Sequence, residues 1–343
     1  MKREAAFWKP LGDQNVQCQL CPHRCKINDG TLGICSVRKN EQGKLYTLIY
    51  GSCSSLAADP IEKKPLYHFH PGTQAFSLGT VGCNLKCSHC QNYGISTADP
   101  EFPYLKDVMP EQVVELAREH DCEGIAWTYN EPTIWHEFPL DASKLAKKAG
   151  LYTVYVSNGY INEEPLKEIS QYLDAINVDV KAFHDEFYKR ICKARLEPVL
   201  STCERAKELD IHVEVTYLVI PGMNDSLDEV KNFCKWILEK LGPDTPVHFS
   251  RFHPDHNMTN VSATPIEALL KIYDLAKEIG LLYVYLGNVP PGSYENTYCP
   301  KCGNLCIERE GYSTRLTGLK DGTCVKCGAN ISVRFDKYKK QKI

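Results

Sequence analysis

Short apolar runs with the length of β-strands recur through the middle of the chain, at residues 75–81, 124–129, 151–156, 175–180, 211–220, 247–252 and 281–286. Helix-like segments separate most of them. Residues 110–120 begin with Pro-Glu, residues 226–241 begin with a capping-box pattern and stop at Gly242, and residues 265–279 follow a capping Thr264 and end at Gly280. This alternation predicts right-handed βαβ units around a parallel sheet.

The number of these units bears on the architecture. Six or seven strand–helix repeats exceed what an open sheet requires, so we expect an α/β fold with a full or partial barrel, of the partial (β/α)6 TIM type. In such a barrel the chemistry lies at the carboxyl ends of the strands, which directs the search for functional residues to the segments that follow each apolar run.

The composition adds one anomaly, the cysteine content. The chain has 343 residues, a formal net charge of −3 and 17 cysteines. The near-zero charge gives no support for a nucleic-acid or membrane partner, and neither a secretory signal nor a run of ~18 apolar residues is present. We therefore expect a cytoplasmic protein, in which reduced thiols in this number are first of all metal ligands.

Eleven of the cysteines form three groups, and these divide the chain into a Cys-rich N-terminal segment (1–74), a barrel (75–290) and a C-terminal module (291–343). The groups are Cys18, Cys21, Cys25 and Cys35; Cys83, Cys87 and Cys90; and Cys299, Cys302, Cys324 and Cys327. The other six are scattered, and we expect small buried hydrophobes there: Cys53, Cys122, Cys192, Cys203, Cys234 and Cys306.

The triplet Cys83, Cys87 and Cys90 follows directly on the first strand of the predicted barrel. Three closely spaced thiolates can bind three irons of a [4Fe–4S] cluster and leave the fourth iron open to a substrate. The alternatives are a zinc site or chance clustering, but zinc usually takes paired CxxC units. The spacing therefore favours an iron–sulfur cluster.

A CxxxCxxC motif after the first strand of a parallel α/β barrel resembles the signature of radical S-adenosylmethionine (SAM) enzymes. The surroundings, with Gln91 and Asn92 after the last cysteine, look like the branch of pyruvate formate-lyase activating enzymes. A finer resemblance, to the radical SAM member of the AmmeMemoRadiSam set, rests on the phrase DPIEKKPLYHF at residues 59–69 and on the N-terminal cysteine pattern.

This resemblance implies that Cys83, Cys87 and Cys90 hold a [4Fe–4S] cluster whose open iron binds SAM. One electron then breaks the sulfur–C5′ bond and yields a 5′-deoxyadenosyl radical that abstracts hydrogen from the substrate. The implied partners are a low-potential donor such as ferredoxin or flavodoxin and, in the finer resemblance, the other two AmmeMemoRadiSam proteins.

Further SAM contacts are implied at strand ends. Glu131 stands in the Glu-Pro remnant of the family's Gly-Gly-Glu-Pro motif, and the alternative for it is a solvated loop glutamate. Ser157 and Asn158 match a turn that lines the SAM site, although Asn-Gly is also an ordinary turn signal. Asp179 and Lys181 resemble the Asp-x-Lys motif of activating enzymes, where the lysine approaches the SAM carboxylate; a structural ion pair is the alternative.

Four more positions complete the expected cofactor site. Ile220 lies in the loop that covers adenine in relatives, and His253 ends the sixth strand, where activating enzymes place a histidine against SAM. Asn92 belongs to the motif around the triplet. His89 replaces the large aromatic residue that commonly packs on adenine, so it can still stack but is more polar.

The two outer cysteine groups have different spacings. Cys299, Cys302, Cys324 and Cys327 form two CxxC units, typical of a zinc ribbon or a rubredoxin-like module, so structural zinc is favoured over a mononuclear iron. Cys18, Cys21, Cys25 and Cys35 are less regular, and no spacing rule decides between zinc and an auxiliary iron–sulfur cluster.

The predicted function is reductive SAM cleavage followed by hydrogen abstraction from an unidentified small-molecule or RNA substrate. Within the same class, the alternative is an activase for a glycyl-radical enzyme, which would need a large protein partner. From another class, the alternative is a metal-dependent adaptor in which the C-terminal ribbon binds RNA or a protein. The acidic balance of the chain and the barrel pattern disfavour the adaptor.

Overall fold

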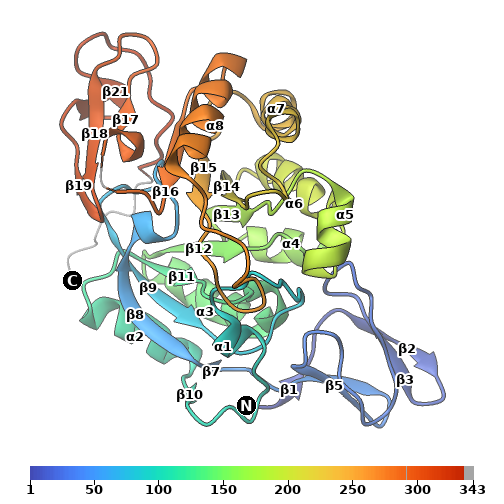
Figure 1. Cartoon of the computed structure of the whole chain (residues 1–343). Helices are drawn as coiled ribbons and strands as arrows, with labels where there is room; N and C mark the ends of the chain where they lie inside the picture. Colours follow the sequence, from blue (N-terminus) through green and yellow to red (C-terminus); the bar gives the residue numbers. More distant parts are fainter. Residues whose placement is uncertain (291, 336–343) are drawn as a thin grey trace.

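The computed structural model describes residues 1–290 and 292–335, and its centre is one eight-stranded sheet in the order β16-β15-β14-β13-β12-β11-β9-β8 (Figure 1). Seven of the strands are parallel and follow one another in chain order: β9 (Gln74–Gly79), β11 (Gly124–Trp127), β12 (Tyr152–Ser157), β13 (Ala175–Asp179), β14 (His212–Val219), β15 (Val247–Arg251) and β16 (Val284–Gly287). The predicted α/β class with a parallel sheet is therefore confirmed.

The two edges of this sheet are β16 and β8 (Ser55–Pro60). Strand β8 is antiparallel to β9 and comes from the part of the chain assigned in the sequence to the N-terminal segment. No ladder joins β16 to β8 among the described residues. Neighbouring strands that always advance in one direction are typical of a singly wound, barrel-like sheet.

The helices of the α/β units lie between successive strands along the chain: α2 (Pro110–Glu119), α3 (Glu137–Lys148), α4 (Glu163–Ser170), α6 (Glu197–Glu208), α7 (Leu227–Trp236) and α8 (Ile266–Ile279). Ser226 caps α7 as expected, because its hydroxyl accepts from the Glu229 N–H at 3.3 Å. The predicted cap Thr264 is wrong. Its hydroxyl instead donates to the Val219 carbonyl at 2.6 Å, and the position that precedes α8 is Pro265.

The N-terminal segment forms two small three-stranded sheets beside the carboxyl end of the large one (Figure 1). One contains β1 (Arg3–Glu4), β6 (Lys44–Thr47) and β5 (Arg38–Glu41), and the other contains β2 (Trp8–Gly12), β3 (Asn15–Cys18) and β4 (Lys26–Ile27). A short pair, β7 (Ser52–Cys53) with β10 (Lys106–Asp107), follows. The buried pair of Arg38 with Glu137, 2.5 Å apart, joins this segment to α3.

The C-terminal module lies at the opposite side of the molecule (Figure 1). It contains a sheet of β17 (Thr297–Tyr298), β18 (Leu305–Glu310) and β19 (Ser313–Arg315), and a pair of β20 (Leu319–Lys320) and β21 (Thr323–Cys324). Residues 291 and 336–343 of the range expected for this module lie outside the described residues.

Residues 61–70 connect the module to the large sheet. The Arg309 guanidinium donates to the Tyr67 carbonyl at 2.7 Å, and the His68 ring lies 2.9 Å from the Ser332 carbonyl. The Glu214 carboxylate on β14 accepts from the Tyr67 and His68 N–H groups at 3.0 and 2.7 Å. This segment belongs to the phrase that carried the finer family resemblance, and its described contacts are structural.

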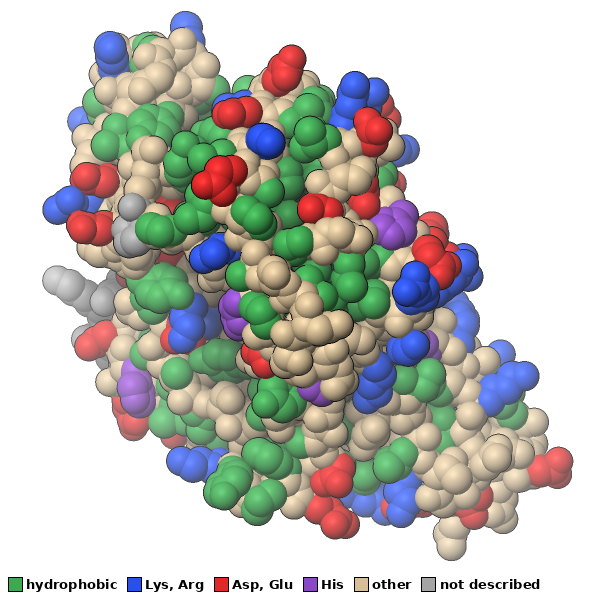
Figure 2. Space-filling model, viewed as in Figure 1, with side chains coloured by type: hydrophobic (Ala, Val, Ile, Leu, Met, Phe, Trp, Pro, Cys, Tyr) green, Lys and Arg blue, Asp and Glu red, His purple; other side chains and the backbone are tan. Residues whose placement is uncertain are grey.

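Two surface properties bear on partners. Acidic and basic side chains are interspersed on the face shown in Figure 2, in keeping with the net charge of −3. No helix in residues 1–290 and 292–335 has both the length and the apolar character needed to cross a bilayer.

Candidate active site and metal centres

The loop that carries Cys83, Cys87 and Cys90 leaves the carboxyl end of β9 and is fixed by backbone bonds to other loops. The N–H groups of Lys86 and Ser88 donate to the carbonyls of Cys192 and Ile191 at 2.9 and 3.2 Å. The Asn257 N–H, in the segment after β15, donates to the Ser88 carbonyl at 3.0 Å. The triplet therefore sits where the predicted chemistry belongs, at the carboxyl end of the sheet.

Gly82 sets the start of this loop. Its φ is +83°, which side-chain-bearing residues rarely adopt, and a Cβ there would lie 2.6 Å from the Cys35 carbonyl oxygen and 2.7 Å from Val37. Because Gly82 has no side chain, the triplet loop can pass directly against the backbone of Cys35 in the N-terminal cysteine group.

Each thiol of the triplet is half-buried and has a neighbour. Cys83 Sγ accepts from the Leu85 N–H at 3.4 Å and from Asn158 Nδ2 at 3.7 Å. Cys90 Sγ lies 3.1 Å from the Ser96 hydroxyl. A hydrogen bond with the Cys192 thiol, together with burial, raises the pKa of Cys87. N–H···S bonds of this kind orient thiolate ligands and adjust the potential of a bound cluster.

Glu131 joins the ends of two neighbouring strands. Its carboxylate is 1% exposed and accepts from the Thr133 N–H, the Ser157 hydroxyl and the Asn158 N–H at 2.8–2.9 Å. Burial raises its pKa, although these bonds favour the carboxylate. Glu131 is therefore no solvated loop residue, and through Asn158 it positions a donor to Cys83.

On β13 and just after it, Lys181 Nζ lies 2.5 Å from Asp179 Oδ2, so the two residues do form an ion pair. Lys181 is also near enough to Cys87 and His89 for its charge to act on both. The other oxygen of Asp179 is buried and has no hydrogen-bond partner among the described residues.

His89, in the triplet loop at the carboxyl end of the sheet, has a buried ring whose nitrogens make no hydrogen bond to the described residues. Its side chain is 4% exposed, yet neither ring nitrogen has a partner within the described part of the chain. Burial lowers the pKa of His89 to about 3, so the ring is neutral at physiological pH. A buried donor and acceptor without partners is costly, so the His89 ring is a candidate to contact a bound ligand.

The remaining predicted contacts differ in their surroundings. Ile220 is fully buried at the end of β14, and its N–H donates to the Asn224 side chain at 2.6 Å. Asn92 is exposed and precedes α1 (Tyr93–Ser96). His253 is exposed after β15, in the segment that reaches Ser88 through Asn257. The contacts of these residues with SAM stay predictions.

Three residues near the triplet or near Glu131 escaped the sequence analysis. Cys192, expected to be an ordinary thiol, contacts Cys87. Asn84 accepts from Asn158 at 2.9 Å, and its carbonyl bonds the His23 ring at 2.7 Å. Tyr155 is buried on β12 with an unpartnered hydroxyl, as judged over the described residues. Asn84 alone carried a signal, because it lies inside the cysteine motif.

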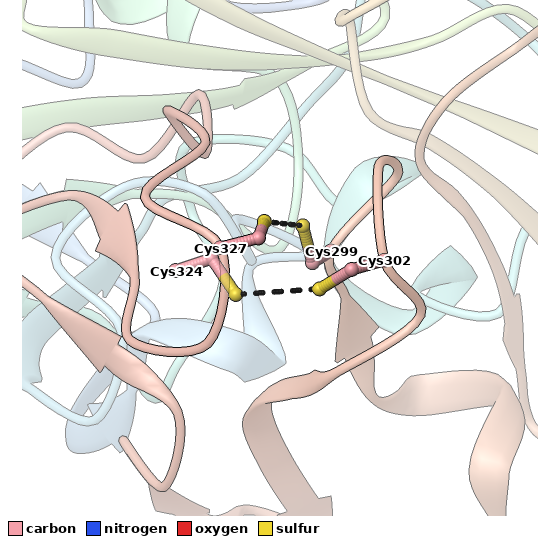
Figure 3. Close-up of side chains that lie close together, drawn as sticks. All are labelled: Cys299, Cys302, Cys324 and Cys327. Atoms are coloured by element: carbon pink, nitrogen blue, oxygen red, sulfur yellow. Dashed lines mark hydrogen bonds between the residues drawn. The ribbon is translucent and has the colours of Figure 1, made fainter.

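The four C-terminal thiols converge on one point, and their sulfurs point toward one another from two loops (Figure 3). The sulfurs of Cys299 and Cys327 lie 3.6 Å apart and those of Cys302 and Cys324 lie 3.7 Å apart. All four lie within 4.8 Å of one another. Sulfurs on a tetrahedral zinc with bonds of about 2.3 Å are about 3.8 Å apart, so this group could hold a single metal ion.

The four N-terminal thiols also come together, but around a hollow. Cys18, Cys21, Cys25 and Cys35 all line one cavity, which leaves about 340 Å³ free of protein atoms when space open to solvent is included. Unlike the C-terminal four, they do not form a group whose sulfurs all lie within 4.8 Å, as far as the described residues go.

Comparison with known proteins identifies the class. The Radical SAM superfamily matches residues 77–237, which span β9 to α7 and include the triplet. An uncharacterized protein of Methanocaldococcus jannaschii is 49% identical over 334 residues, covering 96% of this chain and 99% of that protein. The chain belongs to the radical SAM superfamily, and it is an enzyme of that class.

Two more distant relatives have named activities. A protein of Methanocaldococcus jannaschii named provisionally as a glycyl-radical enzyme activating enzyme is 26% identical over 212 residues, covering 61% of this chain and 77% of that protein. A GTP 3′,8-cyclase of Limosilactobacillus fermentum is 25% identical over 291 residues, covering 76% of this chain and 82% of that protein. Further relatives are named as pyruvate formate-lyase activating enzymes, as the sequence resemblance implied.

The family implies a [4Fe–4S] cluster and SAM, and the residues present fit both. Three thiols on one loop are the ligand set that such a cluster requires when one iron stays open. Within residues 1–290 and 292–335, the ring nitrogens of His89 and one oxygen of Asp179 are buried polar atoms without a hydrogen-bond partner, which a polar cofactor would satisfy.

Proposed function

We propose that the protein reductively cleaves SAM and abstracts hydrogen from an unidentified small-molecule or RNA substrate. The observation that carries the proposal is the triplet loop at the carboxyl end of β9, with the buried His89 inside it, whose ring nitrogens have no hydrogen-bond partner among the residues that the structure describes. A partial barrel opening at this end would give the substrate access to the same rim.

The chain's own residues would act by holding and orienting. Cys83, Cys87 and Cys90 would be the cluster ligands, and bound SAM would supply the 5′-deoxyadenosyl radical once it accepts one electron. Glu131 would keep Asn158 directed at Cys83. The ion pair with Asp179 favours the charged form of Lys181, and this ammonium group would attract the SAM carboxylate.

Ile220, His253 and Asn92 are proposed as the outer contacts of the cofactor, and Ser157 is proposed as a residue that positions its surroundings. Ile220 would supply apolar surface for adenine, and His253 and Asn92 would supply polar groups from exposed loops. Ser157 would act through Glu131, whose carboxylate accepts its hydroxyl at 2.8 Å.

For the C-terminal group we propose one structural zinc ion held by Cys299, Cys302, Cys324 and Cys327. The sulfur–sulfur separations of 3.6 and 3.7 Å support this proposal. Gly303 and Gly328, with φ of +70° and +69°, let each CxxC loop fold back on itself. A mononuclear iron would fit the same thiols.

The cellular setting is proposed on the same basis. A cytoplasmic enzyme of this class would take electrons from ferredoxin or flavodoxin and would work with the other two proteins of the AmmeMemoRadiSam set. The N-terminal segment (1–74), the barrel (75–290) and the C-terminal module (291–343) are the proposed units of the chain.

Formation of 5′-deoxyadenosine tests the proposal. Protein reconstituted with iron and sulfide without oxygen, then given dithionite and SAM, is expected to form 5′-deoxyadenosine and methionine. Cys90→Ala should form none, whereas Cys122→Ala, at a buried thiol far along the chain from any metal group, should retain the activity. A verified cluster without product, in the presence of host extract as the substrate source, would contradict it.

The glycyl-radical activase is not favoured over this function, because relatives with both activase and cyclase names match the chain. It would be recognised by a glycyl-radical signal on a partner protein after incubation with SAM and reductant.

A further inference from the structure

The cavity lined by the four N-terminal cysteines contains groups that suit a metal centre. Four of its lining residues are the thiols Cys18, Cys21, Cys25 and Cys35, and the others include apolar side chains: Leu20, Ile27, Ile34 and Ile134. Cys18, Cys21 and Cys35 are less than a tenth exposed, and Cys25 is half-buried. No other part of the proposed function uses these thiols.

The spacing of these sulfurs separates this site from the zinc-like one. The C-terminal sulfurs approach within 3.6 and 3.7 Å, as one small ion requires. The N-terminal four line a cavity together, yet they do not meet the 4.8 Å spacing that the C-terminal four meet, judged over the described residues. Thiols that each bind a different iron of a cube must stand further apart than thiols that share one ion.

Arg38 supplies a second, independent observation. It lines the same hollow, is 1% exposed, and its Nε has no partner in the described ranges, although its other nitrogens bind the Ala6 carbonyl and Glu137. Its charge acts on both Cys18 and Cys35. A buried cation facing thiols, with a donor left over, fits an anionic group between them.

The hollow adjoins the catalytic loop. Asn84, next to Cys83, lines it, and the Asn84 carbonyl bonds the His23 ring at 2.7 Å. On the other side of Cys83, the Cys35 carbonyl lies against Gly82. The N-terminal cysteine cavity and the triplet loop are therefore in direct contact on both sides of Cys83.

We propose that Cys18, Cys21, Cys25 and Cys35 hold a second [4Fe–4S] cluster that relays electrons to the catalytic one, with Arg38 as its buried counter-charge. Four thiolates satisfy all four irons, so this cluster has no open iron for substrate and serves electron transfer. It accepts one electron from a low-potential donor, becoming reduced, and passes that electron to the oxidised catalytic cluster, with no bond made or broken.

The metal content of anaerobically reconstituted full-length protein tests the site. Wild type is expected to hold about eight irons and eight sulfides per chain, and the triple variant Cys83→Ala, Cys87→Ala, Cys90→Ala about four of each. A double variant in the C-terminal group, Cys299→Ala with Cys302→Ala, is the matched control and should lose zinc while it keeps all the iron. A triple variant without iron, or with a second zinc instead, would overturn the proposal.

Two further measurements do not depend on the triple variant. In reduced wild type, electron paramagnetic resonance should show two cluster signals, of which SAM changes one; a single signal would overturn the proposal. Arg38→Gln should shift the potential of the SAM-insensitive cluster to more negative values and leave the SAM-sensitive one unchanged, because only the former loses its neighbouring cation. Equal potentials in variant and wild type would remove Arg38 from the proposal.

Discussion

The buried polar groups at the two ends of the parallel strands differ in their hydrogen bonding. Towards the amino ends, the Glu214 carboxylate is fully buried and accepts from two backbone N–H groups and from His212 and His248 at 3.0 and 2.7 Å. At the carboxyl ends, the buried ring of His89 and one oxygen of Asp179 have no partner among the described residues.

This difference separates structure from function. Glu214 has all its bonds within the chain, so it joins β14 to residues 61–70 and through them to the C-terminal module. The His89 ring makes no hydrogen bond within the described part of the chain, so its desolvation is uncompensated there. Histidines occur at both ends, and only their partners distinguish the two roles.

The largest effect on stability is expected at the amino end. Glu214→Gln leaves two histidines and two backbone donors facing a neutral amide, and should lower the free energy of unfolding by about 3 kcal/mol. Urea unfolding measures it. The formation of 5′-deoxyadenosine per folded molecule should not change. A variant as stable as wild type would break the assignment of Glu214 to structure.

Acid should reduce the same contribution. Burial alone would raise the pKa of Glu214, but the bonds from His212 and His248 hold that pKa well below its usual range. The carboxylate therefore stabilises the fold at pH values above its unfolded pKa of about 4.3, and the contribution is lost as the pH falls below that value. The stability gap between wild type and Glu214→Gln should begin to narrow near pH 5 and should keep narrowing as the pH falls towards the lowered pKa of the folded-state carboxylate. A constant gap would show that the charge of Glu214 is unimportant.

A smaller effect is expected where the two cysteine sites meet. Gly82→Ala places a Cβ 2.6 Å from the Cys35 carbonyl at a φ of +83°, a conformation that costs a side-chain-bearing residue about 1–2 kcal/mol. Iron content after reconstitution should fall. Gly94→Ala, in α1 with open space around its Cβ, is the control and should retain its iron. Equal iron in both variants would disprove the close contact.

The smallest effect is expected from His89→Ala. Loss of a ring that stacks on or bonds the cofactor should weaken SAM binding about tenfold, equivalent to about 1.4 kcal/mol. The fall in stability should be smaller than for Glu214→Gln, because the ring packs near Phe187 but its nitrogens have no hydrogen-bond partner among the described residues. Equilibrium dialysis of SAM against the reconstituted variant measures this. A large fall in melting temperature with unchanged SAM affinity would place His89 with Glu214 as a structural residue.

Features that depend on a local sequence pattern could be predicted from the sequence. Apolar periodicity located the seven parallel strands, and cysteine spacing located the triplet and the C-terminal four. Contacts between segments far apart in the sequence could not be predicted from it. The expected cap Thr264 bonds Val219, 45 residues away, and strand β8 joins the large sheet from outside the predicted barrel. Cys192 stands alone in the sequence and meets Cys87 only because η3 (Tyr188–Cys192) docks on the triplet loop.

The proposal that the carboxyl-end rim holds the cofactor is tested most directly by electron paramagnetic resonance of the dithionite-reduced protein with and without SAM. We predict that SAM changes a cluster signal in wild type and in Glu214→Gln, and that it changes nothing in the triple variant of Cys83, Cys87 and Cys90. A wild-type spectrum insensitive to SAM, or a SAM-dependent change that survives in the triple variant, would contradict the assignment.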